Sequence, residues 1–220
     1  MGRTLSGVGV LDKSVAVLDA VARSNEGCSL ADLVDATGIS RATAHRLAVA
    51  LETHGLLRRA DDGRFALGFA LVGLGHAATD GWPLAGAARP ALEALRDTTG
   101  ESVQLYVRDG EHRVCVVSLE SPHELRTIVA EGARLTLAVG SAGRLLSGEP
   151  AQAGWTASVE ERAPGVASVS APVFDTRSGT IVAAVGISGP VARLGPDPGT
   201  RFGPSVALAA GQIAATLATS

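Results

Sequence analysis

Residues 29–67 constrain the fold of this 220-residue chain more than any other segment, because local signals agree along its whole length. Ser29 followed by Asp32 has the capping-box spacing that starts a helix. Gly38 supplies the positive φ of a tight turn, and Ser40 is a favourable N-cap for a second helix. Two helices joined by a glycine turn are typical of a helix-turn-helix motif.

A hairpin follows the second helix of this motif. Residues 56–59 and 64–67 are predicted to form two short strands, joined through the favoured turn sequence Asp61-Asp62-Gly63. A further helix is predicted ahead of the motif, from Asp12 to about Ser24. The buried side of the second helix is predicted to comprise Ala44, Leu47, Ala48, Leu51 and part of His54. The sequence therefore predicts a winged helix-turn-helix domain over residues 1–67.

The second helix of such a motif lies in the major groove of DNA, where its N-terminal residues meet the base edges. Arg41 can pair bidentately with guanine, Thr43 can contact a thymine methyl group or a phosphate, and Arg46 can clamp a phosphate. Arginines on the hairpin are placed to contact the DNA backbone or minor groove. An alternative is that these arginines only solvate the surface. The predicted DNA-binding residues are Ser40, Arg41, Ala42, Thr43, His45, Arg46, Arg58, Arg59 and Arg64.

The net charge of −3 is unexpected for a DNA-binding protein, so its distribution matters. Residues 1–67 carry eight Lys and Arg against eight Asp and Glu, and the remainder carries eleven against fourteen. Within residues 40–64 the balance is five arginines against three acids. Charges act over a Debye length of about 8–10 Å, so a local basic stripe is sufficient for phosphate contacts.

The chain beyond residue 67 is predicted to form a linker helix over 68–82, ending at Trp82-Pro83, and then a domain over 83–220. This domain begins with an amphipathic helix over 84–98. From Ser102 the apolar period changes to two, which indicates strands. The alternating positions of the first two strands are Val103, Leu105 and Val107, then Val114, Val116 and Ser118. Further strands are expected at Leu125–Val129, 165–173 and 179–188, before an open proline-containing stretch and a closing helix at Ser205–Ala218.

Helices flanking a mixed or antiparallel sheet make this second domain α+β. The 46% hydrophobic and 19% charged residues indicate a globular chain, with no apolar run near the roughly 18 residues of a membrane span. Two cysteines, Cys28 and Cys115, are too few for a disulfide scaffold or a structural zinc site. No Gly-x-Ser-x-Gly elbow or phosphate-binding loop indicates catalysis. We therefore expect a cytoplasmic, non-enzymatic protein without metal or cofactor.

Several stretches resemble the IclR family of bacterial transcription regulators. They are the helix-turn-helix with Gly-Arg-Phe-Ala-Leu-Gly at 63–68, Gly-Val-Ala-Ser-Val-Ser-Ala-Pro-Val-Phe-Asp at 165–175, and Ala-Ala-Val-Gly-Ile-Ser-Gly-Pro at 183–190. Residues 7–13 and 43–52 are most similar to the actinobacterial branch that controls leucine and other amino-acid biosynthesis. The resemblance implies a winged helix, a linker helix used in dimerisation and a GAF-like effector-binding domain. It also implies dimers or tetramers that bind paired DNA half-sites.

The resemblance implies an effector pocket for a small carboxylate or amino acid. A backbone-donor loop and two strands would contribute Gly140, Ser141, Ala142, Ser168, Gly186 and Ser188. Free N–H groups and hydroxyls can hold a carboxylate. The chain departs from the family pattern at Gly186, where a polar side chain is frequent, and at 148–155, which is short. A ligand-gated regulator of amino-acid metabolism is the main hypothesis, and a constitutive DNA-binding protein with a ligand-blind second domain is the alternative.

Overall fold

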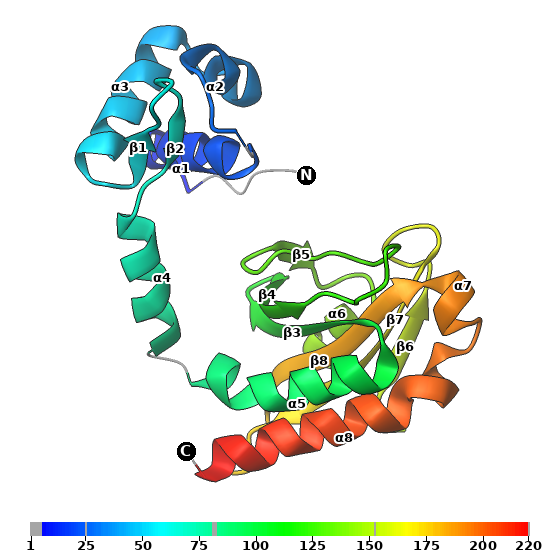
Figure 1. The fold of residues 1–220 in the computed structure, drawn as a ribbon. Helices are drawn as coiled ribbons and strands as arrows, with labels where there is room; N and C mark the ends of the chain where they lie inside the picture. Colours follow the sequence, from blue (N-terminus) through cyan, green and yellow to red (C-terminus); the bar gives the residue numbers. More distant parts are fainter. Residues whose placement is uncertain (1–5, 25, 81–82, 152, 220) are drawn as a thin grey trace. The chain divides into compact units, whose positions relative to one another are not determined.

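The computed structural model describes residues 6–24, 26–80, 83–151 and 153–219. The chain divides into two compact units, Met1–Gly81 and Trp82–Ser220, and each has its own hydrophobic core. Figure 1 shows the elements of both units. The predicted break at Trp82 lies outside the described residues, as do the last two residues of the predicted linker segment.

Unit 1 begins with three helices, α1 (Gly9–Ala22), α2 (Leu30–Thr37) and α3 (Arg41–Thr53), followed by the hairpin β1 (Leu57–Arg59) and β2 (Phe65–Leu67). The predicted capping box is present, since the Ser29 hydroxyl accepts the Asp32 N–H and the Asp32 carboxylate accepts the Ser29 N–H. Gly38 has a φ of 68°. These local signals position α3 across α1 and α2, because all three helices contribute to one core with Leu57 and Phe65.

Three details of unit 1 differ from the sequence predictions. Helix α1 begins at Gly9 rather than Asp12, whose carboxylate instead accepts the Ser6 N–H and hydroxyl. Ser40 occupies the N-cap position of α3, but its hydroxyl donates to Thr43 Oγ1 and does not cap the helix. His54 is exposed, because it lies one residue beyond the end of α3, where the chain turns toward the hairpin.

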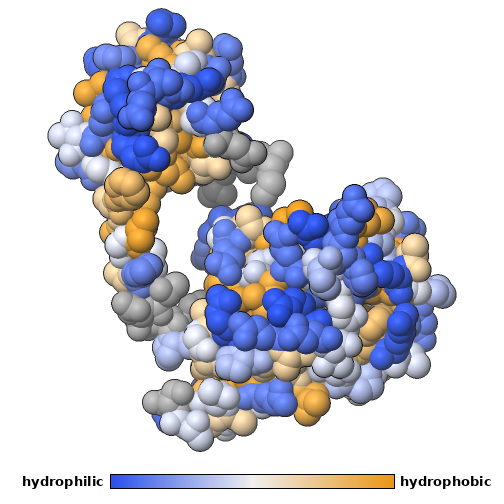
Figure 2. Space-filling model, in the orientation of Figure 1, coloured by the Kyte–Doolittle hydropathy of each residue, from blue (hydrophilic) through white to orange (hydrophobic). Residues whose placement is uncertain are grey.

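Helix α4 (Ala70–Asp80) follows the hairpin and is apolar on its surface. Phe69, Val72 and Leu74 are 77%, 55% and 60% exposed. Figure 2 shows apolar side chains along this helix. A helix that leaves large apolar side chains in solvent presents a surface for another protein chain.

Unit 2 is built on one antiparallel sheet of six strands in the order β5-β4-β3-β8-β7-β6. Helix α5 (Leu84–Thr99) ends at Gly100, with a φ of 70°, and leads into the sheet. The strands are β3 (Ser102–Asp109), β4 (His112–Leu119), β5 (Arg134–Thr136), β6 (Thr156–Val159), β7 (Val166–Phe174) and β8 (Ile181–Pro190). The order places β3 and β8, which are far apart in sequence, side by side at the centre.

The two faces of this sheet carry different layers. Helices α5 and α8 (Pro198–Thr219) cover one face and bury its apolar core, as Figure 1 shows. The short helix α6 (Ser141–Leu146) covers the other face and packs near Tyr106 and Cys115. A last short helix, α7 (Val191–Leu194), joins β8 to α8. The second face is thus only partly filled, and polar residues of the central strands lie on it.

A bulge in the β3–β4 pair determines which β4 residues reach this second face. Leu105 pairs with Val117, whereas the next residue, Tyr106, pairs with Cys115, so Val116 has no partner. The extra residue reverses the side on which the remaining β4 side chains lie. Cys115 therefore joins the α6 face, while Val117 remains in the α5–α8 core. The alternating set Val114, Val116 and Ser118 is half-buried, and its two valines pack against the α5–α8 core.

Unit 2 differs from the sequence predictions in one predicted strand, one strand that was not predicted and one helix boundary. Leu125–Val129 is irregular, because arginine side chains bind carbonyls at its start. Arg193 donates to the Leu125 carbonyl, and Arg126 donates to the two carbonyls just before the segment. Strand β6 forms directly after the short 148–155 region, where no strand was predicted. Helix α8 begins at Pro198 rather than Ser205. Proline is favoured in a first helical turn, and the Asp197 carboxylate caps it by accepting from Thr200.

Among the described residues, α8 is long and apolar enough to cross a membrane by length and composition alone. One side of it, with Phe202, Val206 and Ile213, lies in the core of unit 2.

Candidate DNA-recognition helix and effector pocket

The N-terminal turn of α3 exposes the residues predicted to read DNA. Ser40, Arg41, Ala42, His45 and Arg46 are exposed, and Thr43 is half-buried. Ala44 and Ala48 on the opposite side are fully buried in the unit 1 core, which fixes the helix orientation. Within the part of the chain that the structure describes, Arg41, His45 and Arg46 form no side-chain hydrogen bond or ion pair. Their polar groups are therefore available to an external partner.

The three hairpin arginines are engaged within the chain to different degrees. Arg58 lies over the Phe69 ring at 5.4 Å and is exposed. Arg59 lies over the Phe65 ring at 4.3 Å and approaches the Glu52 carboxylate at 3.3 Å. Arg64 donates to the Asp32 carboxylate at 2.9 Å, which connects the hairpin to the capping box of α2. Arg64 thus holds the wing against the helix-turn-helix, whereas the other two guanidinium groups remain at the surface.

The second candidate site is a pocket in unit 2, on the sheet face that α6 covers. Its empty space, including the open mouth, is about 410 Å³. All six residues predicted for an effector site line it. They come from the start of α6 and from strands β7 and β8: Gly140, Ser141, Ala142, Ser168, Gly186 and Ser188. The remaining lining residues are Gln104, Tyr106, Arg113, Ser158, Arg162, Val166, Ser170 and Ile187. The structure therefore brings the predicted residues together and adds others that the prediction lacked.

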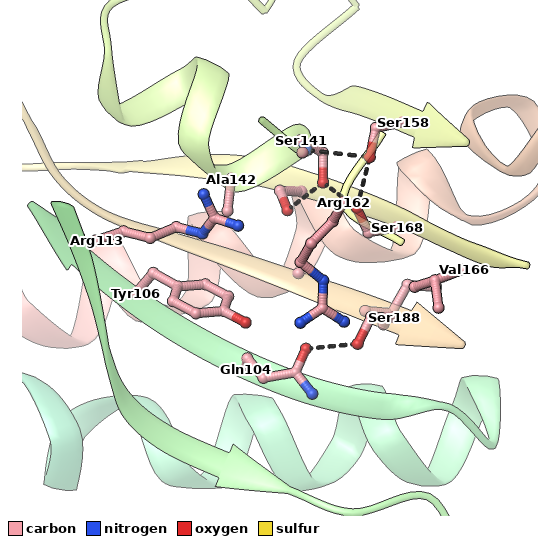
Figure 3. Close-up of a pocket in the computed structure, with 14 residues that line it drawn as sticks. Gln104, Tyr106, Arg113, Ser141, Ala142, Ser158, Arg162, Val166, Ser168 and Ser188 are labelled. Atoms are coloured by element: carbon pink, nitrogen blue, oxygen red, sulfur yellow. Dashed lines mark hydrogen bonds between the residues drawn. The ribbon is translucent and has the colours of Figure 1, made fainter. Parts of the chain in front are cut away.

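A network of serine hydroxyls forms one wall of this pocket, as Figure 3 shows. Ser141 Oγ lies 2.8 Å from both Ser168 Oγ and Ser170 Oγ, and Ser158 Oγ lies 2.9 Å from Ser168 Oγ. The predicted backbone donors are also engaged, since Ser141 N–H donates to Ser158 Oγ and Gly140 N–H to the Glu161 carboxylate. Because hydroxyls donate and accept by rotation, this wall can exchange its internal hydrogen bonds for bonds to a ligand.

Arg113 supplies a buried positive charge to the pocket. Its side chain lies over the Tyr106 ring at 5.4 Å and donates from Nη1 to the carbonyls of Thr136 and Val139. Arg113 is only 3% exposed, and burial lowers the pKa of its guanidinium while raising that of the Tyr106 hydroxyl. Its Nε atom is buried without a hydrogen-bond partner in the described residues. A Cβ at Gly143 would lie 2.5 Å from Arg113 Nη1, so glycine there makes room for the guanidinium.

Gln104 and Arg162 lie at the other end of the pocket. The Gln104 side-chain oxygen accepts from Ser188 Oγ at 2.9 Å, which leaves its amide nitrogen buried without a partner among the described residues. Arg162 extends from the turn between β6 and β7. In Figure 3 the polar ends of Arg162, Gln104 and Tyr106 point toward the same space.

Gly186 contributes space rather than a polar side chain. It pairs with Ser170 across β7 and β8, and a Cβ at Gly186 would lie 2.3 Å from Ser170 Oγ. Ser170 occupies that space and joins the serine network. The Ser170 hydroxyl, on β7, therefore occupies the space that a side chain at position 186 would take.

Of the pocket residues that sequence reasoning missed, Gln104 had a detectable signal. It alternates with Val103 and Leu105 on β3, which places a polar residue on the face opposite the apolar core. Arg113 had none, since the bulge at Val116 determines its side. Tyr106 is buried and also lines the pocket.

The fold and the two sites define a class of protein, a helix-turn-helix regulator with a separate ligand-binding domain. Residues 10–61 match the IclR helix-turn-helix domain, and residues 76–151 and 148–215 match the family described as bacterial transcriptional regulator IclR C-terminal. The chain belongs to the IclR family of transcription regulators. Members of this family bind DNA and small-molecule effectors and are typically oligomeric.

Individual relatives agree with this assignment. The chain is 28% identical over 221 residues to the glycerol operon regulatory protein of Streptomyces griseus, a match that covers 85% of this chain and 87% of that protein. It is 32% identical over 116 residues to the regulator KipR of Bacillus subtilis, covering 53% of this chain and 46% of KipR. The structure of an IclR homologue from Microbacterium hydrocarbonoxydans, complexed with 4-hydroxybenzoate, superimposes with a TM-score of 0.80 at 20% identity, covering 96% and 100% of the two chains. This last likeness concerns the fold.

Proposed function

We propose that this protein is a sequence-specific transcription regulator whose affinity for paired DNA half-sites changes when a small anionic metabolite occupies the unit 2 pocket. One observation carries the gating part of the proposal: Arg113 Nε and Gln104 Nε2 are buried donors without partners in the described residues, and both side chains line the pocket. Buried donors are almost always hydrogen-bonded, so acceptor oxygens of a ligand would satisfy them.

The DNA-binding part is supported by the exposed start of α3. Arg41 and Arg46 lie one and a half turns apart on a helix whose other face is fixed in the core, and neither is engaged with another side chain in the described residues. In this proposal Arg41 reads a base and Arg46 binds phosphate. Arg58 and Arg59 contact the DNA backbone from the wing, and Arg64 supports that wing through Asp32.

A second candidate function is constitutive DNA binding with a ligand-blind unit 2. Hydrogen bonds within the chain favour this alternative, because Gly140 N–H already donates to Glu161 and Ser141 N–H to Ser158. Against it stand the unpartnered donors of Arg113 and Gln104, which no acceptor among the described residues reaches. A ligand-blind pocket would gain stability by replacing a buried unpaired arginine with an apolar residue. The balance favours a ligand.

The exposed apolar side chains of α4 are assigned to a homodimer interface, and pairing of dimers would produce a tetramer. A two-fold dimer presents two recognition helices to half-sites of a palindrome. We also propose that the protein regulates genes of amino-acid metabolism and that it acts in the cytoplasm.

Selection of fragmented genomic DNA by the purified protein tests the proposal, with and without a pool of amino acids, keto acids and small carboxylates. Enrichment of a few palindromic fragments that changes with the pool supports ligand gating. Enrichment that never responds to any member would favour the ligand-blind alternative, and no enrichment at moderate salt would refute DNA recognition. Arg41→Ala should lose the enriched fragments, whereas Arg89→Ala on α5 serves as the charge-matched control.

A further inference from the structure

The pocket in unit 2 contains two positive charges and no negative one. Arg113 enters from β4 and Arg162 from the turn before β7, and no Asp or Glu is among the described residues that line it. Arg113 is 3% exposed and forms no ion pair within the described residues. The acid next to Arg162 in sequence, Glu161, is not among the lining residues. Its carboxylate binds Arg144 at 2.7 Å and accepts the N–H of Gly140, which lines the pocket.

The two guanidinium groups are close enough to affect one another. Burial is the main cause of the lowered pKa of Arg113, and the charge of Arg162 lowers it further. Two cations held near each other in a partly dehydrated site repel, and the repulsion grows as water leaves. A ligand with a single negative charge would leave one of them uncompensated. A zwitterionic amino acid has no net charge, so the net charge of both guanidinium groups would stay uncompensated.

The turn that carries Arg162 is fixed on both sides of this residue. Glu160 adopts a left-handed conformation with a φ of 59°, and its carboxylate accepts the Gly165 N–H at 2.7 Å. Glu161 is held by Arg144 and Gly140 as described. Arg162 itself forms no hydrogen bond or ion pair with any described residue, although its neighbours are anchored. A constrained turn that presents an unengaged, half-buried arginine to a pocket positions that arginine for a ligand.

We propose that the effector is a small, doubly charged anion, a dicarboxylate or a phosphate-type dianion, and that Arg162 is the residue that selects it over monoanions and zwitterions. This inference rests on the proposed function, because it specifies the ligand of the same pocket. One anionic group binds at the buried end beside Arg113, and Arg162 with the Gln104 amide binds the second negative charge. The serine wall accepts or donates around the remaining ligand oxygens.

Isothermal titration of the full-length chain with matched probes tests this proposal. Succinate is compared with butyrate, which has the same number of carbons and one charge fewer, and with the amino acid alanine. Glutarate tests a longer dicarboxylate, and inorganic phosphate at slightly alkaline pH tests both charges on one group. We expect at least one dianion to bind about tenfold or more tightly than butyrate, because charge-assisted hydrogen bonds are the stronger ones.

Arg162→Gln is the informative variant, since Arg162 is half-buried and its loss removes no hydrogen bond or ion pair among the described residues. We expect it to reduce dianion affinity about tenfold and to leave the affinity for butyrate within about twofold. Arg177→Gln, in the exposed turn between β7 and β8, removes the same charge outside the pocket and should change neither. The proposal is overturned if no dianion binds, if butyrate or alanine binds as tightly, or if the two variants behave alike. DNA selection is a separate assay, so these failures leave DNA recognition intact.

Discussion

Substitution of Gly186 by alanine should destabilise unit 2 more than any ordinary glycine-to-alanine change. Its φ lies outside the left-handed region, so the effect comes from space alone. A Cβ there would lie 2.3 Å from Ser170 Oγ and 2.6 Å from the Val169 carbonyl oxygen. The first neighbour is a side chain that can rotate, whereas the second is backbone of the paired strand β7, so the two strands must separate locally.

The expected cost follows from two contributions. Overpacking of a close-packed site costs about 1–3 kcal/mol. Rotation of Ser170 away from the new methyl group breaks its 2.8 Å hydrogen bond to Ser141, which contributes about 1 kcal/mol more. The free energy of unfolding of unit 2 should therefore fall by about 2–4 kcal/mol, and Tm by roughly 4–16 °C.

Urea and thermal unfolding, followed by far-UV circular dichroism, measure this effect. Gly211→Ala is the matched control, because a Cβ on this exposed α8 residue would meet nothing within 4 Å. It should leave stability unchanged or raise it by up to about 1 kcal/mol through helix propensity. The double variant Gly186→Ala with Ser170→Ala should be less destabilised than the sum of the single variants, since one of the two collisions is gone. A Gly186→Ala protein within about 0.5 kcal/mol of wild type would refute the β7–β8 register and the packing of the serine wall.

Three further predictions concern DNA binding, acid stability and thiol chemistry. Arg41→Ala should weaken operator binding by about 1–3 kcal/mol and relax one base position, whereas Arg59→Ala should weaken binding to all sequences alike. Fluorescence anisotropy on operator variants measures both effects. Full affinity in both variants would show that α3 is not the recognition helix. The pKa of Asp32 lies below 3.8, chiefly because Ser29 donates to its carboxylate, so this group stabilises the fold above that pH and the contribution is lost as pH falls through the lowered value. Asp32→Asn should therefore be less stable than wild type at neutral pH, with the difference shrinking in urea unfolding at about pH 3; a difference independent of pH would contradict the capping-box assignment. Burial raises the pKa of the Cys115 thiol to about 12, so iodoacetamide at neutral pH should label it only after unfolding, as mass spectrometry would show, and rapid native labelling would place it at the surface.

The parts of the fold that were predictable are those encoded by neighbouring residues. Ser29, Asp32 and Gly38 act within a few positions of one another, and the structure contains the capping box and the left-handed turn they predict. The helix-turn-helix follows from them without long-range information. The strand predicted at Leu125–Val129 failed for the opposite reason. Its β-branched residues favour a strand, but Arg193, from a distant part of the chain, satisfies one of its carbonyls and holds it in an irregular path.

The candidate pocket divides in the same way. Six of its lining residues were found through family resemblance, and all six lie together, although their binding role stays a prediction. Arg162 could not be found, because charged residues on a turn are normally solvated. What distinguishes it is that the two residues before it are anchored: the Glu160 carboxylate accepts the Gly165 N–H within the turn, and the Glu161 carboxylate accepts the N–H of Gly140 from another segment.

The position of the Arg113 charge in the pocket depends on Val116, the β4 residue that has no partner on β3. In an unbroken strand, Arg113 and Cys115 would share the face of Val117 and Leu119, which is the core beneath α5 and α8. A guanidinium there would be a buried charge among apolar side chains, at a cost of several kcal/mol. The bulge moves Arg113 to the opposite face, where the Thr136 and Val139 carbonyls accept its protons and the ligand space lies beside it. Residues 114–117 are all apolar, so periodicity leaves their phase open, and the irregular register keeps Arg113 out of the helix-covered core.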